Sequence, residues 1–87
     1  MVARALNRRS SYKKQYQAFV TKLYLARLET GLTQSEAAKR LQQPQQFISR
    51  IEHGQRRVDV IELLHIAKVY GKPITYFDPS HPPKPFP

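Results

Sequence analysis

The sequence predicts a small all-α domain of four helices followed by a short helical fragment, and three observations support this fold class. The chain has 87 residues, enough for one hydrophobic core and not for a second domain. Apolar residues recur at spacings of three and four in successive stretches, whereas strand-like alternation is rare. Residues that start and stop helices flank each of these stretches.

The folded part is expected to span about Tyr12 to Phe77, and its first helix should end at Gly31. One stripe of this helix faces inward: Tyr16, Phe19, Val20, Leu23, Ala26 and Arg27. A second helix begins with a capping box, in which the Thr33 hydroxyl accepts the backbone N–H of Glu36 and the Glu36 carboxylate reaches back. Its inward residues are Ala37, Ala38 and Leu41.

A third helix is expected to have Pro44 in its first turn, where the missing N–H of proline costs nothing. This helix turns Ile48 and Ile51 inward and ends near Gly54. Asp59 and Glu62 predict a second capping box, at the start of a fourth helix. The expected inward stripe of the fourth helix is Val60, Leu63, Leu64, Ala67 and Tyr70.

The fourth helix should stop at Gly71 and Pro73. A last short turn over 74–77 then offers two apolar side chains to close the core. The remaining ends are polar: residues 1–11 form a basic N-terminal arm, and residues 78–87 form a tail with five of the seven prolines. Because proline disfavours helix in itself and in the preceding residue, the tail is expected to be extended or disordered.

The charge of the chain favours a polyanionic partner. Fifteen Lys and Arg residues against six acids give a net charge of +9, and residues 1–27 hold seven of the cations and no acid. Such a balance points to nucleic acid first and to an anionic membrane second.

Several function classes are disfavoured by what the sequence contains. There is no cysteine for a disulfide or a thiolate metal site, which is compatible with a cytoplasmic location. No apolar run approaches the roughly 18 residues that span a bilayer. The histidines (His53, His65 and His81) lack metal-ligand spacing, no serine has an adjacent base, and no glycine-rich phosphate loop is present. We therefore expect no enzyme, metal or cofactor.

The connection between the second and third helices is the most informative feature. Only Gln42, Gln43 and Pro44 separate Leu41 from the third helix, so the two helices must cross steeply, as in a helix-turn-helix. The segments GLTQSEAA (31–38) and PQQFISRIEHG (44–54), with LLHIAK (63–68), resemble the XRE/Cro-type, lambda-repressor-like domains of phage repressors and bacterial regulators. The resemblance covers roughly residues 16–77. It departs from the family pattern at Gln42, where a glycine with left-handed backbone is usual.

The resemblance places the third helix in the DNA major groove, with Gln45, Gln46, Ser49 and Arg50 on its outward face as the base-reading residues. Residue chemistry agrees, because glutamine can bond two atoms of adenine and arginine two atoms of guanine. The alternative is an ordinary solvated helix face. Phe47 could pack in the core, touch a thymine methyl or pad a dimer contact, and we favour partial burial.

Further roles follow from the resemblance. Phosphate contacts are expected from Gln34, His53, Arg56 and Arg57. The charge of the basic arm separately suggests that Arg8 and Arg9 contact phosphates, as the N-terminal arms of some DNA-binding domains do. Each of these could instead be an ordinary helix-start, loop or tail residue. Arg27 and Glu52 match the family's buried ion pair, a structural role.

The sequence therefore predicts a double-stranded DNA-binding transcription regulator, a repressor that acts as a cytoplasmic, nucleoid-associated homodimer. Candidate dimer contacts are Tyr24, Leu25, Leu28 and the last turn around Tyr76. One alternative is an antitoxin that binds a toxin through the Pro-rich tail and represses its own operon. A second alternative is a non-specific nucleic-acid module driven by charge. No separate ligand-sensing domain is present, so control by a small molecule is not suggested.

Overall fold

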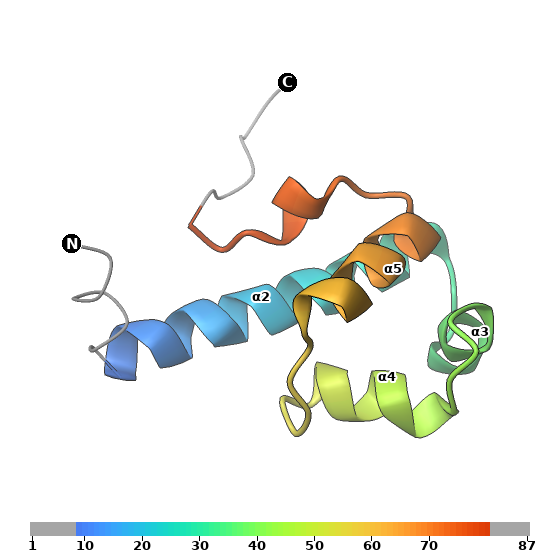
Figure 1. Cartoon of the computed structure of the whole chain (residues 1–87), viewed down its shortest axis with the longest axis horizontal. Coiled ribbons are helices and arrows are strands. Elements are labelled where there is room, and N and C mark those ends of the chain that lie inside the picture. Colours follow the sequence, from blue (N-terminus) through green and yellow to red (C-terminus); the bar gives the residue numbers. More distant parts are fainter. Residues whose placement is uncertain (1–8, 81–87) are drawn as a thin grey trace.

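The computed structural model describes residues 9–80, and within this range the chain forms helices joined by short connections, without strands (Figure 1). The elements are α2 (Arg9–Thr30), α3 (Gln34–Arg40), α4 (Gln45–Glu52), α5 (Val60–Tyr70) and the 3₁₀ turn η1 (Ile74–Phe77). Helix α2 runs through the middle of the molecule; α3 and α4 lie towards its C-terminal half, α5 crosses it, and η1 packs against α2 and α5. The all-α prediction is confirmed.

Helix α2 is longer than the sequence indicated. It begins at Arg9, three residues before the expected start of the folded part at Tyr12. Its inward stripe follows the prediction, with Leu23, Ala26 and Arg27 buried and the residues nearer the N-terminus half-buried. The first turns of α2 extend beyond α4 and α5 (Figure 1). The predicted arm and tail otherwise lie outside the described residues, except for residues 78–80.

Both predicted capping boxes form. Thr33 Oγ1 accepts the Glu36 N–H at 3.0 Å, and Glu36 Oε1 accepts the Thr33 N–H at 2.9 Å. The bond from the Thr33 backbone lowers the pKa of the Glu36 carboxyl. At α5, Asp59 Oδ1 accepts the Glu62 N–H at 2.8 Å and Glu62 Oε1 accepts the Asp59 N–H at 3.1 Å. These boxes satisfy backbone donors that have no partner inside the helix.

The turn between α3 and α4 adopts the backbone that the family's glycine normally provides. Gln42 has a φ of 56°, the one positive φ of a non-glycine residue among residues 9–80. The Gln43 N–H bonds to the Ala38 carbonyl at 2.9 Å and closes the turn. A side chain in this region costs on the order of 1 kcal/mol. Pro44 is the N-cap of α4, one position earlier than the first-turn site that we expected.

The core is built from α2, α3, α4, α5 and η1, and it corrects the expected stripe of α5. Leu63, Ile66, Ala67 and Tyr70 face inward, whereas Val60 is 68% exposed and Leu64 is 48% exposed. The true stripe has the same helical period but is rotated towards Ile66, which is buried, and away from Leu64. Burial raises the pKa of the Tyr70 phenol to about 12.

Two further side chains differ from expectation. Phe47 is 8% exposed and belongs to the core, which is more complete burial than the partial burial that we favoured. In η1, Phe77 is buried but Ile74 is exposed, so the turn supplies one fully buried apolar side chain rather than two. Tyr76 is only partly buried and packs against the core from outside.

Candidate nucleic-acid interface

Helix α4 is buried on one face and presents polar side chains on the other. Phe47, Ile48 and Ile51 are buried, and Gln45, Gln46 and Arg50 are exposed. Within residues 9–80, the side chains of these three polar residues make no hydrogen bond or ion pair. Ser49 is half-buried, and its carbonyl oxygen lies 2.7 Å from Nδ1 of His53, the C-cap residue. The outward face therefore keeps its planar donors and acceptors available to a partner.

The Glu52 carboxylate, at the end of α4, joins three elements. Its Oε2 accepts Arg27 Nε at 2.6 Å, and its Oε1 accepts Arg27 Nη2 at 2.9 Å. The same Oε1 accepts Gln34 Nε2 at 3.0 Å, and Arg27 Nη1 donates to the Leu32 carbonyl at 2.9 Å. Arg27 is 7% exposed, and its bond to Glu52 raises the pKa of the guanidinium against the opposing effect of burial.

This arrangement fixes how α4 is presented, because Glu52 ties the end of α4 to α2 and to the first residue of α3. It also changes the expected role of Gln34. The sequence suggested that the Gln34 side chain bonds a DNA phosphate, but in the structure its amide nitrogen donates to Glu52. The Arg27–Glu52 pair expected from the resemblance is present and is largely screened from solvent, with the side chains 9% and 5% exposed.

Arg56, in the loop after α4, is not the unpaired loop arginine that the sequence suggested. Its guanidinium makes two bonds to the Glu62 carboxylate, at 2.9 and 2.8 Å, and lies 4.7 Å from the centre of the Phe47 ring. The bonds from Arg56 lower the pKa of the Glu62 carboxyl. Because this pair neutralises its charge, Arg56 has less attraction left for a phosphate than the sequence implied.

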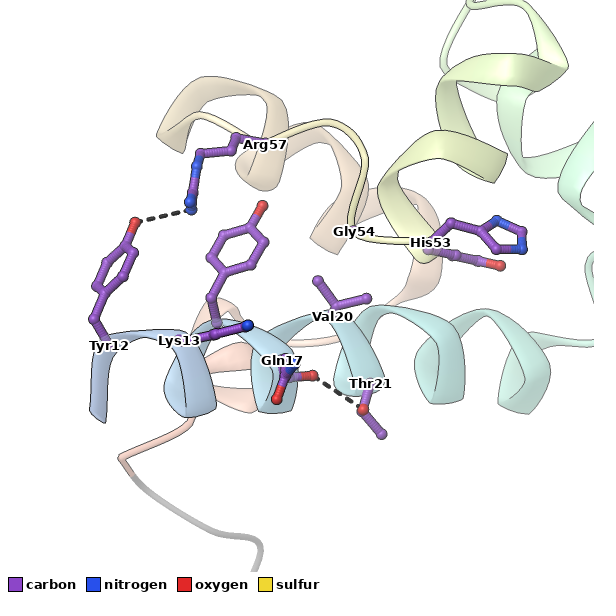
Figure 2. Close-up of a pocket in the computed structure, with 10 residues that line it drawn as sticks. Tyr12, Lys13, Gln17, Val20, Thr21, His53, Gly54 and Arg57 are labelled. Carbon is purple, nitrogen blue, oxygen red and sulfur yellow. Dashed lines mark hydrogen bonds between the residues drawn. The ribbon is translucent and has the colours of Figure 1, made fainter. Parts of the chain in front are cut away.

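Arg57 is held by two tyrosines of α2. Its guanidinium lies 4.6 Å from the Tyr16 ring centre and 5.3 Å from the Tyr12 ring centre, and Nη1 donates to the Tyr12 hydroxyl at 2.9 Å (Figure 2). In the described part of the chain, no carboxylate lies within ion-pair distance of Arg57. Sequence reasoning missed both tyrosines, since they are more than 40 positions away from Arg57 and no local pattern connects them.

All six acidic residues are committed to internal contacts. Glu29, Glu52 and Glu62 form ion pairs, Glu36 and Asp59 cap helices, and Asp78 accepts the Ser80 N–H. Three ion pairs occur among residues 9–80, and none of them involves Lys13, Lys14, Arg50 or Arg57. The exposed charge near α4 and the first half of α2 is therefore positive.

Three residues named in the sequence analysis lie at an edge of the described range or beyond it, and two structural features are absent within that range. Arg8 and His81 lie outside the described residues, and Arg9 is the first residue of α2. In the described range, no three His, Cys, Asp or Glu side chains gather as a metal site would require. Over the same range, none of the helices combines the length and apolar character needed to cross a membrane.

Comparison with known proteins agrees with this geometry. A helix-turn-helix family model matches residues 23–77, more than half of the chain. The solved structure of an "XRE-family like protein from Pseudomonas syringae pv. tomato str. DC3000" superimposes with a TM-score of 0.75 at 36% sequence identity. The match covers 79% of this chain and 84% of that one. No protein with a curated description matches. The chain belongs to the XRE family of helix-turn-helix proteins, which are DNA-binding transcription regulators.

Proposed function

We propose that the protein represses transcription by reading double-stranded DNA with α4 in the major groove. The observation that carries this proposal is the set of exposed, unbonded side chains of Gln45, Gln46 and Arg50 on a helix whose other face is core. Glutamine amides and an arginine guanidinium are two-headed groups that match adenine and guanine edges. Ser49, half-buried on the same face, is the fourth proposed base-reading residue.

The DNA backbone would lie against the ends of α4. Arg57 and His53 are the best-placed phosphate contacts at its C-terminal end, because both are exposed and Arg57 has no acidic partner among the described residues. Gln34 and Arg56 have secondary roles in this proposal, since their side chains already bond Glu52 and Glu62. Arg8 and Arg9 of the predicted arm stay as proposed phosphate contacts.

Selection from a random DNA library, followed by affinity measurements on the enriched site, tests the base-reading roles. Gln46→Ala and Arg50→Ala should each lose about 1–3 kcal/mol, roughly 5- to 150-fold in Kd, and should relax specificity at one position. Lys68→Ala is the matched control, because Lys68 is exposed and belongs to α5 rather than to the reading helix α4. If the library yields no enriched motif, base reading is refuted and the non-specific alternative stands.

The protein should act as a homodimer, because one reading helix covers few base pairs and useful specificity needs two half-sites about 34 Å apart. The expected α2 contact residues, Tyr24, Leu25 and Leu28, are exposed. The first turn of α5 is more exposed still, with Val60 at 68% and Ile61 at 62%. We infer that this α5 surface makes the contact, since it follows the loop at the end of α4 and so can set the spacing of two reading helices.

Sedimentation of the protein with and without its selected site tests the dimer. Ile61→Asp should abolish the dimer on DNA, and Leu25→Asp, an equivalent change on α2, should not. If Leu25→Asp abolishes the dimer and Ile61→Asp does not, the dimer interface lies on α2 instead. A monomer in both states of the wild-type protein would remove the dimer from the proposal.

A further inference from the structure

A cleft of about 630 Å³ lies between the first half of α2 and the end of α4 with the loop that follows it (Figure 2). Small-molecule sites in proteins usually measure roughly 300–1,000 Å³. Lys13, Tyr16 and Val20 line the α2 side of the cleft, and Gly54 and Arg57 line the loop side. The cleft is thus large enough for a compound of about one or two rings.

The charged groups of the cleft favour an anion. Arg57 is held in place by the tyrosines of α2, and Lys13 projects from the same helix. Glu52 is the one acid in the lining, and its carboxylate is already satisfied by Arg27 and Gln34. Two full positive charges also outweigh the partial negative charge, roughly half an elementary charge, at the C-terminal end of α4.

The uncharged groups favour a ligand with a flat ring. The rings of Tyr12 and Tyr16 line the cleft together with the methyl groups of Val20 and the bare backbone of Gly54. Such a lining combines apolar area with a few polar groups that orient the ligand, which is the usual composition of a small-molecule site.

One wall of the cleft comes from a part of the chain that the helix-turn-helix family model does not match. The match begins at residue 23, whereas the α2 residues that line the cleft lie between Tyr12 and Thr21. One wall of the cleft thus lies outside the segment that the family model matches, and the other wall includes His53 and Arg57.

We propose that this cleft binds a small aromatic anion, a flat ring carrying a carboxylate or phosphate group, and that the bound anion weakens DNA binding. The second half of the proposal rests on the proposed function, in which Arg57 and His53 contact the DNA backbone. A ligand that accepts hydrogen bonds from the free N–H groups of Arg57 would prevent these groups from binding a DNA phosphate. A single domain would then carry both the DNA-reading surface and its control.

Titration of the ¹⁵N-labelled full-length chain by NMR tests the site. Salicylate and adenosine monophosphate are the anionic probes, and salicylamide is the neutral counterpart of salicylate. We expect amide shifts confined to residues 12–21 and 52–57, with a Kd on the order of 1 mM for a probe of about ten non-hydrogen atoms. Salicylamide should bind at least ~10-fold more weakly, because it lacks the charge that the cations recognise.

Two lysine variants make the test specific. Lys13→Met should weaken binding of the anionic probes ~10-fold. Lys14→Met should leave binding unchanged, because Lys14 is exposed on the same helix but does not line the cleft. Both lysines are exposed, so neither variant should disturb folding. Equal effects of the two variants, equal binding of salicylamide, or shifts spread over the exposed end of α3 would overturn the site.

Fluorescence anisotropy on the selected DNA tests the control. With a probe at ten times its Kd, and with the ionic strength held equal by sodium chloride, the apparent Kd for DNA should rise about tenfold. An unchanged DNA affinity would overturn the regulatory half of the proposal. If Lys13→Met weakens DNA binding and the wild-type protein binds no probe, the cleft contacts the DNA backbone rather than a small anion. Failure of the proposed function is distinguished by the library selection, which does not depend on the probes.

Discussion

Replacing Glu52 by alanine should destabilise the protein more than any other single change to a charged residue that the structure describes. The substitution removes the acceptor of two Arg27 bonds and one Gln34 bond, and it leaves Arg27, whose side chain is 9% exposed, without its counter-ion. Breaking a buried ion pair in this way costs about 3–5 kcal/mol. A domain of this size is stable by roughly 5–10 kcal/mol, so the variant should be close to unfolding at room temperature.

Urea unfolding followed by circular dichroism at 222 nm measures this loss. The matched control is Glu29→Ala, which breaks an ion pair with Lys72 on the surface and should have a much smaller effect. The double variant Arg27→Met/Glu52→Leu should recover most of the lost stability, because it removes both charges together. If Glu52→Ala loses less than about 1 kcal/mol, the pair is not desolvated and the reasoning fails.

Three further outcomes are expected. Gln42→Gly should stabilise the protein by about 1 kcal/mol and raise Tm by about 4–8 °C, because glycine adopts a positive φ without strain. Gln43→Gly is the control and should lower Tm, because Gln43 does not have a positive φ. Equal shifts of Tm in the two variants would contradict the strain at Gln42. Because burial raises the pKa of Tyr70 from 10.0 to about 12, the neutral phenol's contribution is complete below pH 10 and is lost as the pH rises towards 12. In thermal melts across this pH range, Tyr70→Phe should therefore lose less stability than the wild-type protein. If the two proteins lose stability equally, ionisation of Tyr70 is not the cause. The bond from Arg56 lowers the pKa of the Glu62 carboxyl below its ordinary 4.5. The stability that the charged Glu62 carboxylate gives the folded protein is therefore complete above pH 4.5 and is lost as the pH falls below that value. Glu62→Gln should remove that part of the acid limb of the stability curve, as measured in urea titrations across pH.

The local signals in the sequence were sufficient for the elements. Thr33 and Asp59 each stand three residues before a glutamate, and both capping boxes form where that spacing predicted. Gly71 ends α5 with a left-handed backbone, and Gln42 adopts the conformation that the family assigns to glycine. In each case the determining interaction lies within five residues along the chain, so the sequence alone contains it.

The features that sequence reasoning missed depend on contacts between distant segments. The periodicity of α5 could not show that Val60 lies beyond the core, because the phase of the inward stripe is set by where α2 and η1 lie. The charge count of the loop after α4 could not show that Arg56 is paired and that Arg57 is stacked on tyrosines. Those contacts convert two similar neighbouring arginines into one neutralised residue and one cation that can still bind a partner.

The internal use of every carboxylate has a consequence for how the protein meets polyanions in general. Each carboxylate has a donor of this chain beside it, as Glu29 has Lys72 and Glu52 has Arg27, so its repulsion of an approaching phosphate chain is reduced. Heparin, RNA and unrelated duplexes should all retain the protein at low salt, as a cation exchanger would. Long-range attraction then brings the protein to any such polymer, and the choice among polymers is left to the short-range fit of a few side chains.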